Sequence, residues 1–342
     1  MKPLKILVKE SIFDDIEGIV NNDTALIEQF LNDNYDVVGT YTIKDNIVDV
    51  KGDVKVKNKR IESLTNGTFR FGTVSQVFCC DECLNLVSLE GAPKEVGEGV
   101  ICSYCISLKT LKGAPEKITG FFDCCGCRGL ISLKGAPEKI DGDFYCNGCT
   151  NLKSLEGAPK EVWGRFNCSG CEKLTSLDGG PEKVDKNFNC SECHKLKSLK
   201  GAPVKVGGNF SCFECDGLTS LNGAPEKVGG DFSCNECDGL TALEGSPKEV
   251  VDDFSCSSCK KLISLKGSPE KVGRNFNCGN CENLTSLVGA PKEVNMYFVC
   301  DNCPSLKSLE GSPEKVGKEF WCRGCKNLII TDQDRKKYKI KS

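Results

Sequence analysis

Residues 210–231 read FSCFECDGLTSLNGAPEKVGGD, and this stretch recurs with small changes on both sides of itself. Its Cys-x-x-Cys unit begins at Cys212, and equivalent units begin every 22 residues from Cys80 to Cys322, without an insertion or a deletion. Twelve such units cover most of the chain. A fixed period of this length is typical of a solenoid, in which each repeat forms one coil that stacks on its neighbours.

The apolar positions of the repeat form columns that predict its inward face. Phe stands two residues before the first Cys of each unit, with Val100 as the one replacement, so Phe and Cys share one side of a strand. Two Leu, such as Leu218 and Leu221, and a Val or Ile after each Gly-x-Pro turn complete the core. We therefore predict a mainly β repeat solenoid of 22-residue coils, with one parallel sheet and little helix on its convex side.

The two ends of the chain depart from the repeat. Residues 11–34 have the apolar spacing of a helix, residues 35–50 read as strand, and residues 54–64 resemble a degenerate coil outside the 22-residue register. Since a solenoid needs a cap over its open core, we predict an α/β N-terminal cap in residues 1–77. The twelve-coil solenoid then spans residues 78–331. Residues 332–342 carry five basic and two acidic residues, and we expect a frayed, soluble tail, with an anchoring or docking role as the alternative.

Composition excludes several classes of protein. The 342 residues include 45 Lys and Arg against 48 Asp and Glu, and this balance argues against a nucleic-acid-binding protein. No apolar run reaches the roughly 18 residues of a membrane-spanning helix. The apolar stretch from Leu4 to Val8 is too short for a signal peptide. We therefore expect a cytoplasmic protein without a membrane partner, whose 26 cysteines are reduced.

The cysteines have a structural and a metal-binding interpretation. Successive Cys-x-x-Cys units are separated by 18 residues, which matches a zinc site, but any such unit in a 22-residue repeat creates this spacing. A buried thiol packs as a small apolar group with a weak donor, and the second Cys can donate to the loop that follows. We predict structural thiols with no metal and no cofactor. A zinc or iron–sulfur array and redox disulfides are the alternatives, and only Cys79 and Cys125 lie outside the two columns, at outward positions.

Catalytic groups are poorly represented. His194 is the single His of the chain and stands in a variable position directly after Cys193. Two neighbours in sequence do not supply the dedicated geometry of a Cys–His pair. The glycines recur as turn residues and form no phosphate-binding loop. We therefore predict that the protein is not an enzyme.

The charged residues after the repeat Pro alternate in sign from coil to coil. Glu226 is followed 22 residues later by Lys248, while Lys227 is followed by Glu249. Opposite charges thus lie side by side on the rim. Each exposed pair contributes about 0.2–1 kcal/mol, so these charges are expected to help set the register.

Three outward columns line the predicted sheet face, at positions −3, −1 and +1 from each first Cys. The middle of the −1 column is small and polar, while the C-terminal end of the face carries Tyr297, Val299 and Trp321. Because exposed aromatic side chains often anchor protein interfaces, we predict that this cluster binds a partner protein. The alternative is that the cluster covers the open end of the solenoid against the tail. The further candidate residues are Phe121, Tyr145, Asp231 and Asp253.

The pattern F-x-C-x-x-C-x-x-L, as in Phe166, Cys168, Cys171 and Leu174, resembles the leucine-rich-repeat superfamily. It is similar to short BspA-like repeats and to tandem repeats of phage and gut-bacterial proteins. The resemblance covers residues 78–331 and departs from the usual pattern in having Cys at both ladder positions.

The resemblance implies a non-enzymatic phage or bacterial interaction protein that engages a host or partner protein through its sheet face. If the chain is phage-encoded, the host cytoplasm is its expected location. The alternatives are a structural, virion-associated assembly protein and a metal-loaded cysteine array.

Overall fold

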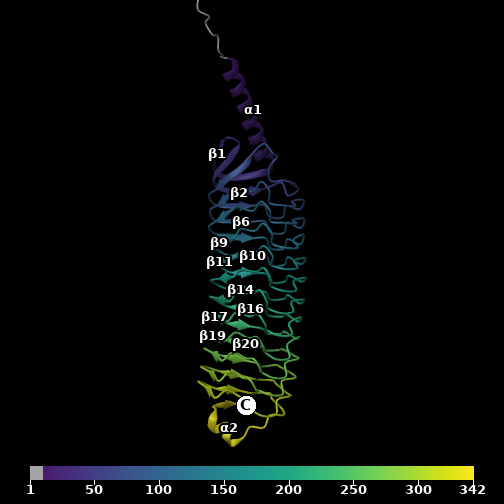
Figure 1. Ribbon diagram of the computed structural model, residues 1–342, viewed down its shortest axis with the longest axis vertical. Helices are drawn as coiled ribbons and strands as arrows, with labels where there is room; N and C mark the ends of the chain where they lie inside the picture. Colours follow the sequence, from purple (N-terminus) through teal and green to yellow (C-terminus); the bar gives the residue numbers. More distant parts are fainter. Residues whose placement is uncertain (1–10) are drawn as a thin grey trace, which may run out of the picture.

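The computed structural model describes the backbone of residues 11–342 and the side chains from Asp23 onward. The stretch from Leu4 to Val8, on which the signal-peptide prediction was made, lies outside these residues. Figure 1 shows a long stack of coils, with the helix α1 (Ser11–Asn34) projecting from one end and the short helix α2 (Asp332–Lys337) at the other. Within the described residues, no helix is both long and apolar enough to cross a lipid bilayer.

The N-terminal cap joins a helix to a long hairpin. Helix α1 spans the residues predicted as helix and buries Ile27 and Leu31 against the body. The region predicted as one strand is a hairpin of β1 (Tyr35–Lys44) and β2 (Ile47–Val56), turned at Asp45 and Asn46, which both have positive φ. Strand β2 pairs in parallel with both β3 (Arg70–Val74) and β4 (Val77–Cys79), so it starts two ladders. The predicted α/β cap is confirmed.

The first ladder carries the Phe column. Its strands are parallel and in register, so that Phe210 lies opposite Phe188 on one side and Phe232 on the other. After β4 this ladder consists of β6 (Gly99–Ile101), β8 (Phe121–Asp123), β10 (Phe144–Tyr145), β12 (Phe166–Asn167), β14 (Phe188–Asn189), β16 (Phe210–Ser211), β18 (Phe232–Ser233), β20 (Phe254–Ser255), β22 (Phe276–Asn277), β24 (Phe298–Val299), β26 (Phe320–Trp321) and β27 (Ile340–Lys341).

A second ladder, which the sequence did not predict, carries the Val and Ile column. Proline prevents pairing at its own position, but the backbone is extended again two residues later. After β3 this ladder consists of β5 (Glu95–Val96), β7 (Lys117–Ile118), β9 (Lys139–Ile140), β11 (Glu161–Val162), β13 (Lys183–Val184), β15 (Lys205–Val206), β17 (Lys227–Val228), β19 (Glu249–Val250), β21 (Lys271–Val272), β23 (Glu293–Val294) and β25 (Lys315–Val316). The mainly β solenoid is confirmed, with two columns of parallel strands in place of one sheet. The second column pairs from β3 to β7 and again from β9 to β25, and the strand pairing is interrupted between β7 and β9.

The core is a set of stacks that run along the solenoid. The rings of Phe188 and Phe210 lie 5.1 Å apart at an interplanar angle of 3°, and those of Phe210 and Phe232 lie 5.2 Å apart at 4°. The Cys, Leu and Val columns are buried in the same way. Each inward side chain therefore packs against its own counterparts in the two adjacent coils.

The glycine of the Gly-x-Pro turn is required by the close approach of neighbouring coils. Gly223 has a φ of +90°, and a Cβ at this position would lie 2.4 Å from the backbone nitrogen of Lys200. A side chain is therefore excluded by both the backbone conformation and the space available. The small residue that follows, Ala224, packs partly buried against the core.

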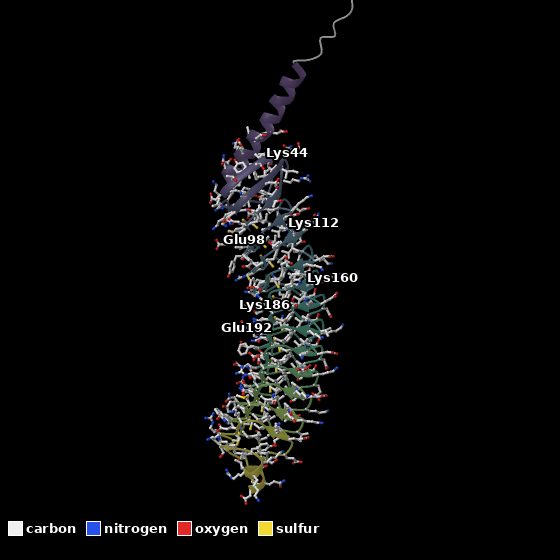
Figure 2. The ribbon with its side chains drawn as sticks, turned by 90° about the vertical axis from the view of Figure 1, so that its left-hand side faces the viewer. Lys44, Glu98, Lys112, Lys160, Lys186 and Glu192 are labelled. Atoms are coloured by element: carbon white, nitrogen blue, oxygen red, sulfur yellow. The ribbon has the colours of Figure 1, made fainter. Side chains whose placement is uncertain are left out.

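The predicted pairing of rim charges is present in the middle of the solenoid. The Lys248 ammonium lies 3.5 Å from the Glu226 carboxylate, and that of Lys227 lies 3.0 Å from Glu249. Figure 2 shows charged side chains such as Lys112 projecting outward from the coils. Since these pairs are exposed, each adds little to stability but favours one register.

The C-terminal tail is ordered, so the expectation of a frayed end was wrong. Thr331 and Asp334 form a capping box at the start of α2. The ring of Tyr338 lies 4.9 Å from that of Phe320, and its hydroxyl donates to the carbonyl of Pro313. Strand β27 then pairs in parallel with β26. The basic residues that suggested a solvated end lie around a buried tyrosine, which closes the core.

We expect Phe210→Ala to lower the free energy of unfolding by about 3–5 kcal/mol, because it opens a cavity between Phe188 and Phe232. Glu226→Gln removes one exposed ion pair and should cost less than about 1 kcal/mol. Denaturant titration followed by circular dichroism measures both. Equal losses would contradict the assignment of inward and outward faces.

Candidate functional site

The second Cys of each unit donates a hydrogen bond to the preceding coil. The thiol of Cys215 lies 3.2 Å from the carbonyl oxygen of Cys190, and that of Cys237 lies 3.1 Å from that of Cys212. The same bond joins every adjacent pair of units from Cys105 to Cys325. The acceptor is thus in the coil before, 25 residues upstream, and not in the following loop as the sequence suggested. The carbonyl that accepts this bond belongs to the residue directly after the strand of the preceding coil; Cys190, for example, follows β14, which ends at Asn189.

Burial raises the pKa of the donor thiols of Cys171, Cys193 and Cys259 above the ordinary value. These thiols are therefore protonated near neutral pH, and only the protonated form can donate. Within residues 23–342, no three His, Cys, Asp or Glu side chains converge in an arrangement that could hold a metal ion. The hydrogen bonds give the cysteines a role in joining coils.

Three cysteines are only half-buried. Cys79 and Cys125 occupy the outward positions that the sequence predicted, and Cys325 lies in the last coil. The thiol of Cys79 donates to the carboxylate of Asp81 at 3.1 Å, and its partial burial raises its pKa to about 11.

His194 and Cys193 have different surroundings. Cys193 is fully buried and its thiol donates to the carbonyl of Cys168 at 3.4 Å. His194 is exposed, and its Nδ1 lies 3.3 Å from the carboxylate of Asp216. The thiol of Cys193 thus contacts the preceding coil inside the core, while the imidazole of His194 contacts the following coil at the surface.

Tyr297, Val299 and Trp321 come together on the outer face of the first ladder. The rings of Tyr297 and Trp321 lie 5.6 Å apart in an edge-to-face arrangement. With Val299 they border a cleft of about 260 Å³. The remaining lining residues are Asp253, Phe254, Ser255, Asn275 and Asn277. The cleft thus has an aromatic end, a floor of short polar side chains and a carboxylate at its other end.

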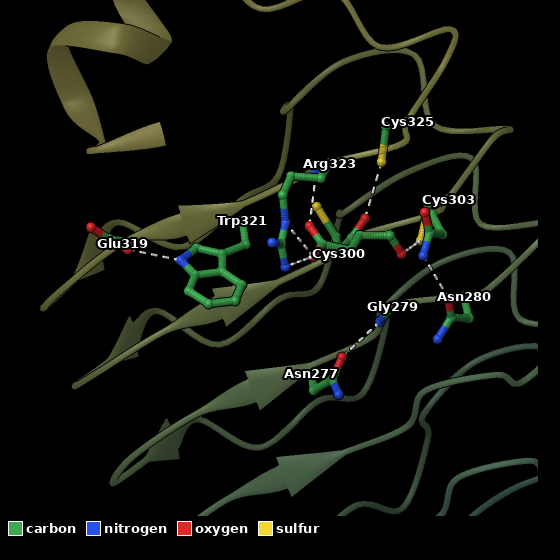
Figure 3. A network of polar contacts seen from close by, with 11 residues as sticks. Asn277, Gly279, Asn280, Cys300, Cys303, Glu319, Trp321, Arg323 and Cys325 are labelled. Atoms are coloured by element: carbon green, nitrogen blue, oxygen red, sulfur yellow. Dashed lines mark hydrogen bonds and ion pairs between the residues drawn. The ribbon is translucent and has the colours of Figure 1, made fainter. Parts of the chain in front are cut away.

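The indole of Trp321 is held in place by charged neighbours (Figure 3). Its N–H donates to the carboxylate of Glu319 at 3.0 Å, and the guanidinium of Arg323 lies 4.4 Å from the ring centroid. Lys339 of the tail pairs with Glu319 at 3.0 Å, and this contact lowers the pKa of the Glu319 carboxyl. The cluster therefore borders the tail, as the alternative interpretation requires, and also leaves a cleft open beside Tyr297.

The structure does not bring Phe121 and Tyr145 to this cleft. Both lie on the same face near the N-terminal end of the stack, in β8 and β10. The ring of Phe121 covers Gly99, where a Cβ would lie 2.5 Å from a ring carbon, and the hydroxyl of Tyr145 donates to Asp143 at 2.6 Å.

Asp231 and Asp253 belong to a ladder that the sequence analysis missed. In the −3 column, the side-chain Oδ1 of one coil accepts a hydrogen bond from the backbone N–H of the equivalent residue in the next coil. Asp231 accepts from Asp253 at 3.1 Å, and Asp253 accepts from Asn275 at 2.9 Å. The full run is Asn187, Asn209, Asp231, Asp253, Asn275 and Tyr297. The unbroken series of Asn and Asp was the available signal, and of the two candidate acids only Asp253 lines the cleft.

The periodic ladders and the stacked core establish the architecture. The chain is a β-solenoid of 22-residue turns. A comparison with protein-family models finds no match, and a comparison with curated proteins finds none. Among solved structures, the chain is similar to a leucine-rich repeat protein from Bacteroides ovatus. The likeness has a TM-score of 0.47 at 17% identity and covers 86% of this chain and 80% of the other.

In the native protein, we expect a thiol reagent at pH 8 to label no more than Cys79, Cys125 and Cys325, because the other thiols are buried. All 26 should react after unfolding in denaturant. The labelling rate of Cys79 should keep rising as the pH is raised above 9 towards its pKa of about 11, since the thiolate is the reactive form.

Rapid native labelling of most of the other thiols would contradict the stacked core. Metal analysis of protein purified without added metal is the companion measurement. Zinc at roughly one ion per two coils would contradict the donor role of the thiols and favour a metal-loaded array.

Proposed function

We propose that the chain is a non-enzymatic, protein-binding solenoid whose partner docks on the sheet face at the cleft of Tyr297, Val299 and Trp321. The observation that carries the proposal is the edge-to-face pair of Tyr297 and Trp321 beside an open cleft. Because Glu319 and Arg323 already hold the indole, little further conformational entropy is lost when a partner binds. Large, pre-ordered aromatic side chains are the usual anchors of protein interfaces.

The neighbouring coils favour a partner that follows the face. Ser211 and Ser233 occupy the −1 column in the two coils before the cleft, and Ser255 occupies it within the cleft, so short side chains leave room above the sheet face. Solenoids commonly bind partners along such extended surfaces. A segment anchored at Trp321 has room to continue across several coils towards Ser211.

The resemblance of the repeats to those of phage and gut-bacterial proteins supports an interaction protein that acts in a bacterial, or host, cytoplasm. Two other functions make different predictions. A virion-associated assembly protein would bind copies of itself or other particle proteins at this face, and a metal-loaded array would contain metal in its cysteine columns.

We expect Tyr297→Ala combined with Trp321→Ala to weaken partner binding by at least about 100-fold, since each anchor contributes on the order of 2 kcal/mol. The melting temperature should change little, because both rings lie outside the core. A photo-crosslinking amino acid at Val299 would identify the partner in a lysate of the source organism.

The control is the same crosslinker at Val288, an exposed residue beside the Gly-x-Pro turn. A partner captured from Val299 and not from Val288, and lost in the double alanine variant, would support the site. Retained binding by the double variant, or a large loss of stability, would assign these aromatic residues to the end cap alone.

A further inference from the structure

We propose that the cleft selects a Lys or Arg side chain, presented by an extended segment of the partner. This inference rests on the docking site proposed above and adds the chemistry of what enters it. It is carried by the placement of one carboxylate opposite two aromatic rings, across a neutral floor.

Asp253 is the single charged residue among those that line the cleft. It stands two coils before Tyr297 in the same column, and two strand spacings put their backbones about 10 Å apart. Its Oδ1 accepts the backbone N–H of Asn275 at 2.9 Å. Across residues 23–342, no basic side chain forms an ion pair with Asp253, so its second oxygen is available to a ligand.

The ladder does not require this negative charge. Asn209 and Asn275 make the same Oδ1 bond in the same column. The carboxylate at Asp253 also lies one coil from that of Asp231, and like charges in adjacent strands are unfavourable. The side-chain amide of Asn209 donates to Asp231 Oδ2 at 3.1 Å, which offsets the charge of that residue. A charge that the fold neither needs nor compensates points to an external cation at Asp253.

The opposite end of the cleft suits the rest of a basic side chain. Lys and Arg lay apolar stems along apolar surfaces and keep their charged ends in polar surroundings. The stem fits against Tyr297 and Val299, and the charged end reaches Asp253 across the floor of Ser255, Asn275 and Asn277. A cation near these rings is also favoured by their π faces, as the contact between Arg323 and Trp321 illustrates.

Other side chains fit this cleft less well. An acidic side chain would be repelled by Asp253. A neutral apolar side chain would desolvate the free carboxylate oxygen without giving it a partner, which is costly. Arg323, the nearest cation to Trp321, is bound by Asp301 through two bonds of 2.9 and 2.6 Å, so it is not available to neutralise Asp253.

The indole of Trp321 supplies the readout. The chain has two Trp, and Trp163→Phe leaves Trp321 as the only indole fluorophore. In this background, the tripeptide amides Gly-Lys-Gly, Gly-Arg-Gly and Gly-norleucine-Gly are titrated. Norleucine has an apolar stem like that of Lys but carries no charge. We expect saturable changes in Trp321 emission for the Lys and Arg probes, and at least about tenfold weaker binding of norleucine.

Asp253→Asn is the decisive variant, because Asn keeps the Oδ1 acceptor of the ladder and removes the charge. It should weaken binding of the Lys probe about tenfold and should not weaken binding of norleucine, which no longer has to desolvate a carboxylate. Asp231→Asn is the matched control, one coil outside the cleft, and should leave Lys binding within about twofold. Thermal melting should not distinguish the two variants.

Equal binding of the Lys and norleucine probes would overturn the proposal, and so would an unchanged Lys affinity in Asp253→Asn or the absence of any change in Trp321 emission. Each of these results is separate from the crosslinking test. A partner captured at Val299 without Lys selectivity would refute only the cation, whereas Lys selectivity without a captured partner would refute the docking function.

Discussion

Every buried group in the solenoid meets its counterpart 22 residues away, and the rest of the structure depends on this constant spacing. The spacing aligns the Phe rings, the backbone ladders, the thiol donors and the Asn and Asp acceptors at once. A single inserted residue would misplace all four kinds of contact between two coils. The absence of insertions from Cys80 to Cys322 therefore follows from the way the coils are joined.

The cysteines solve a problem that this stacking creates. Each strand ends where the chain turns, and the carbonyl just beyond that end is buried without a strand partner. A thiol is small enough for the slot, is tolerated in an apolar core and still offers a weak donor. Because the bond needs the protonated form, burial and hydrogen bonding act together: the same desolvation that raises the pKa of Cys171 keeps in place the proton that it donates to the carbonyl of Cys146. Oxidation of such a thiol would remove a donor and leave a buried carbonyl unpaired.

The sequence allowed the architecture to be predicted because periodicity reports directly on which residues face inward. The helix of residues 11–34 follows from its helical apolar spacing, and the clustering of Tyr297, Val299 and Trp321 follows from strand alternation combined with the 22-residue period. The second ladder was missed because each of its strands carries a single inward apolar residue, such as Val228, whereas the F-x-C unit of the first ladder carries two at alternate positions. The order of the tail depends on Tyr338 packing against Phe320, a contact between residues with no shared pattern. Phe121 and Tyr145 lie on the same face as the cleft, because they occupy outward positions of the repeat. They are nevertheless several coils away from it, in β8 and β10, so a shared face did not bring them into one site.

The acidic candidates show how one residue can serve both fold and surface. Position −3 needs only an Oδ1 that accepts the N–H of the next coil, and Asn and Asp provide it equally. The second side-chain atom is then free to be an amide or a carboxylate without changing the register. The solenoid can therefore set the charge of its sheet face one coil at a time. Beside Asp253, the −1 column carries the short side chain of Ser255, and two coils later the same face carries the ring of Tyr297. The carboxylate of Asp253, which the hydrogen-bond ladder does not require, therefore lies at one end of a cleft.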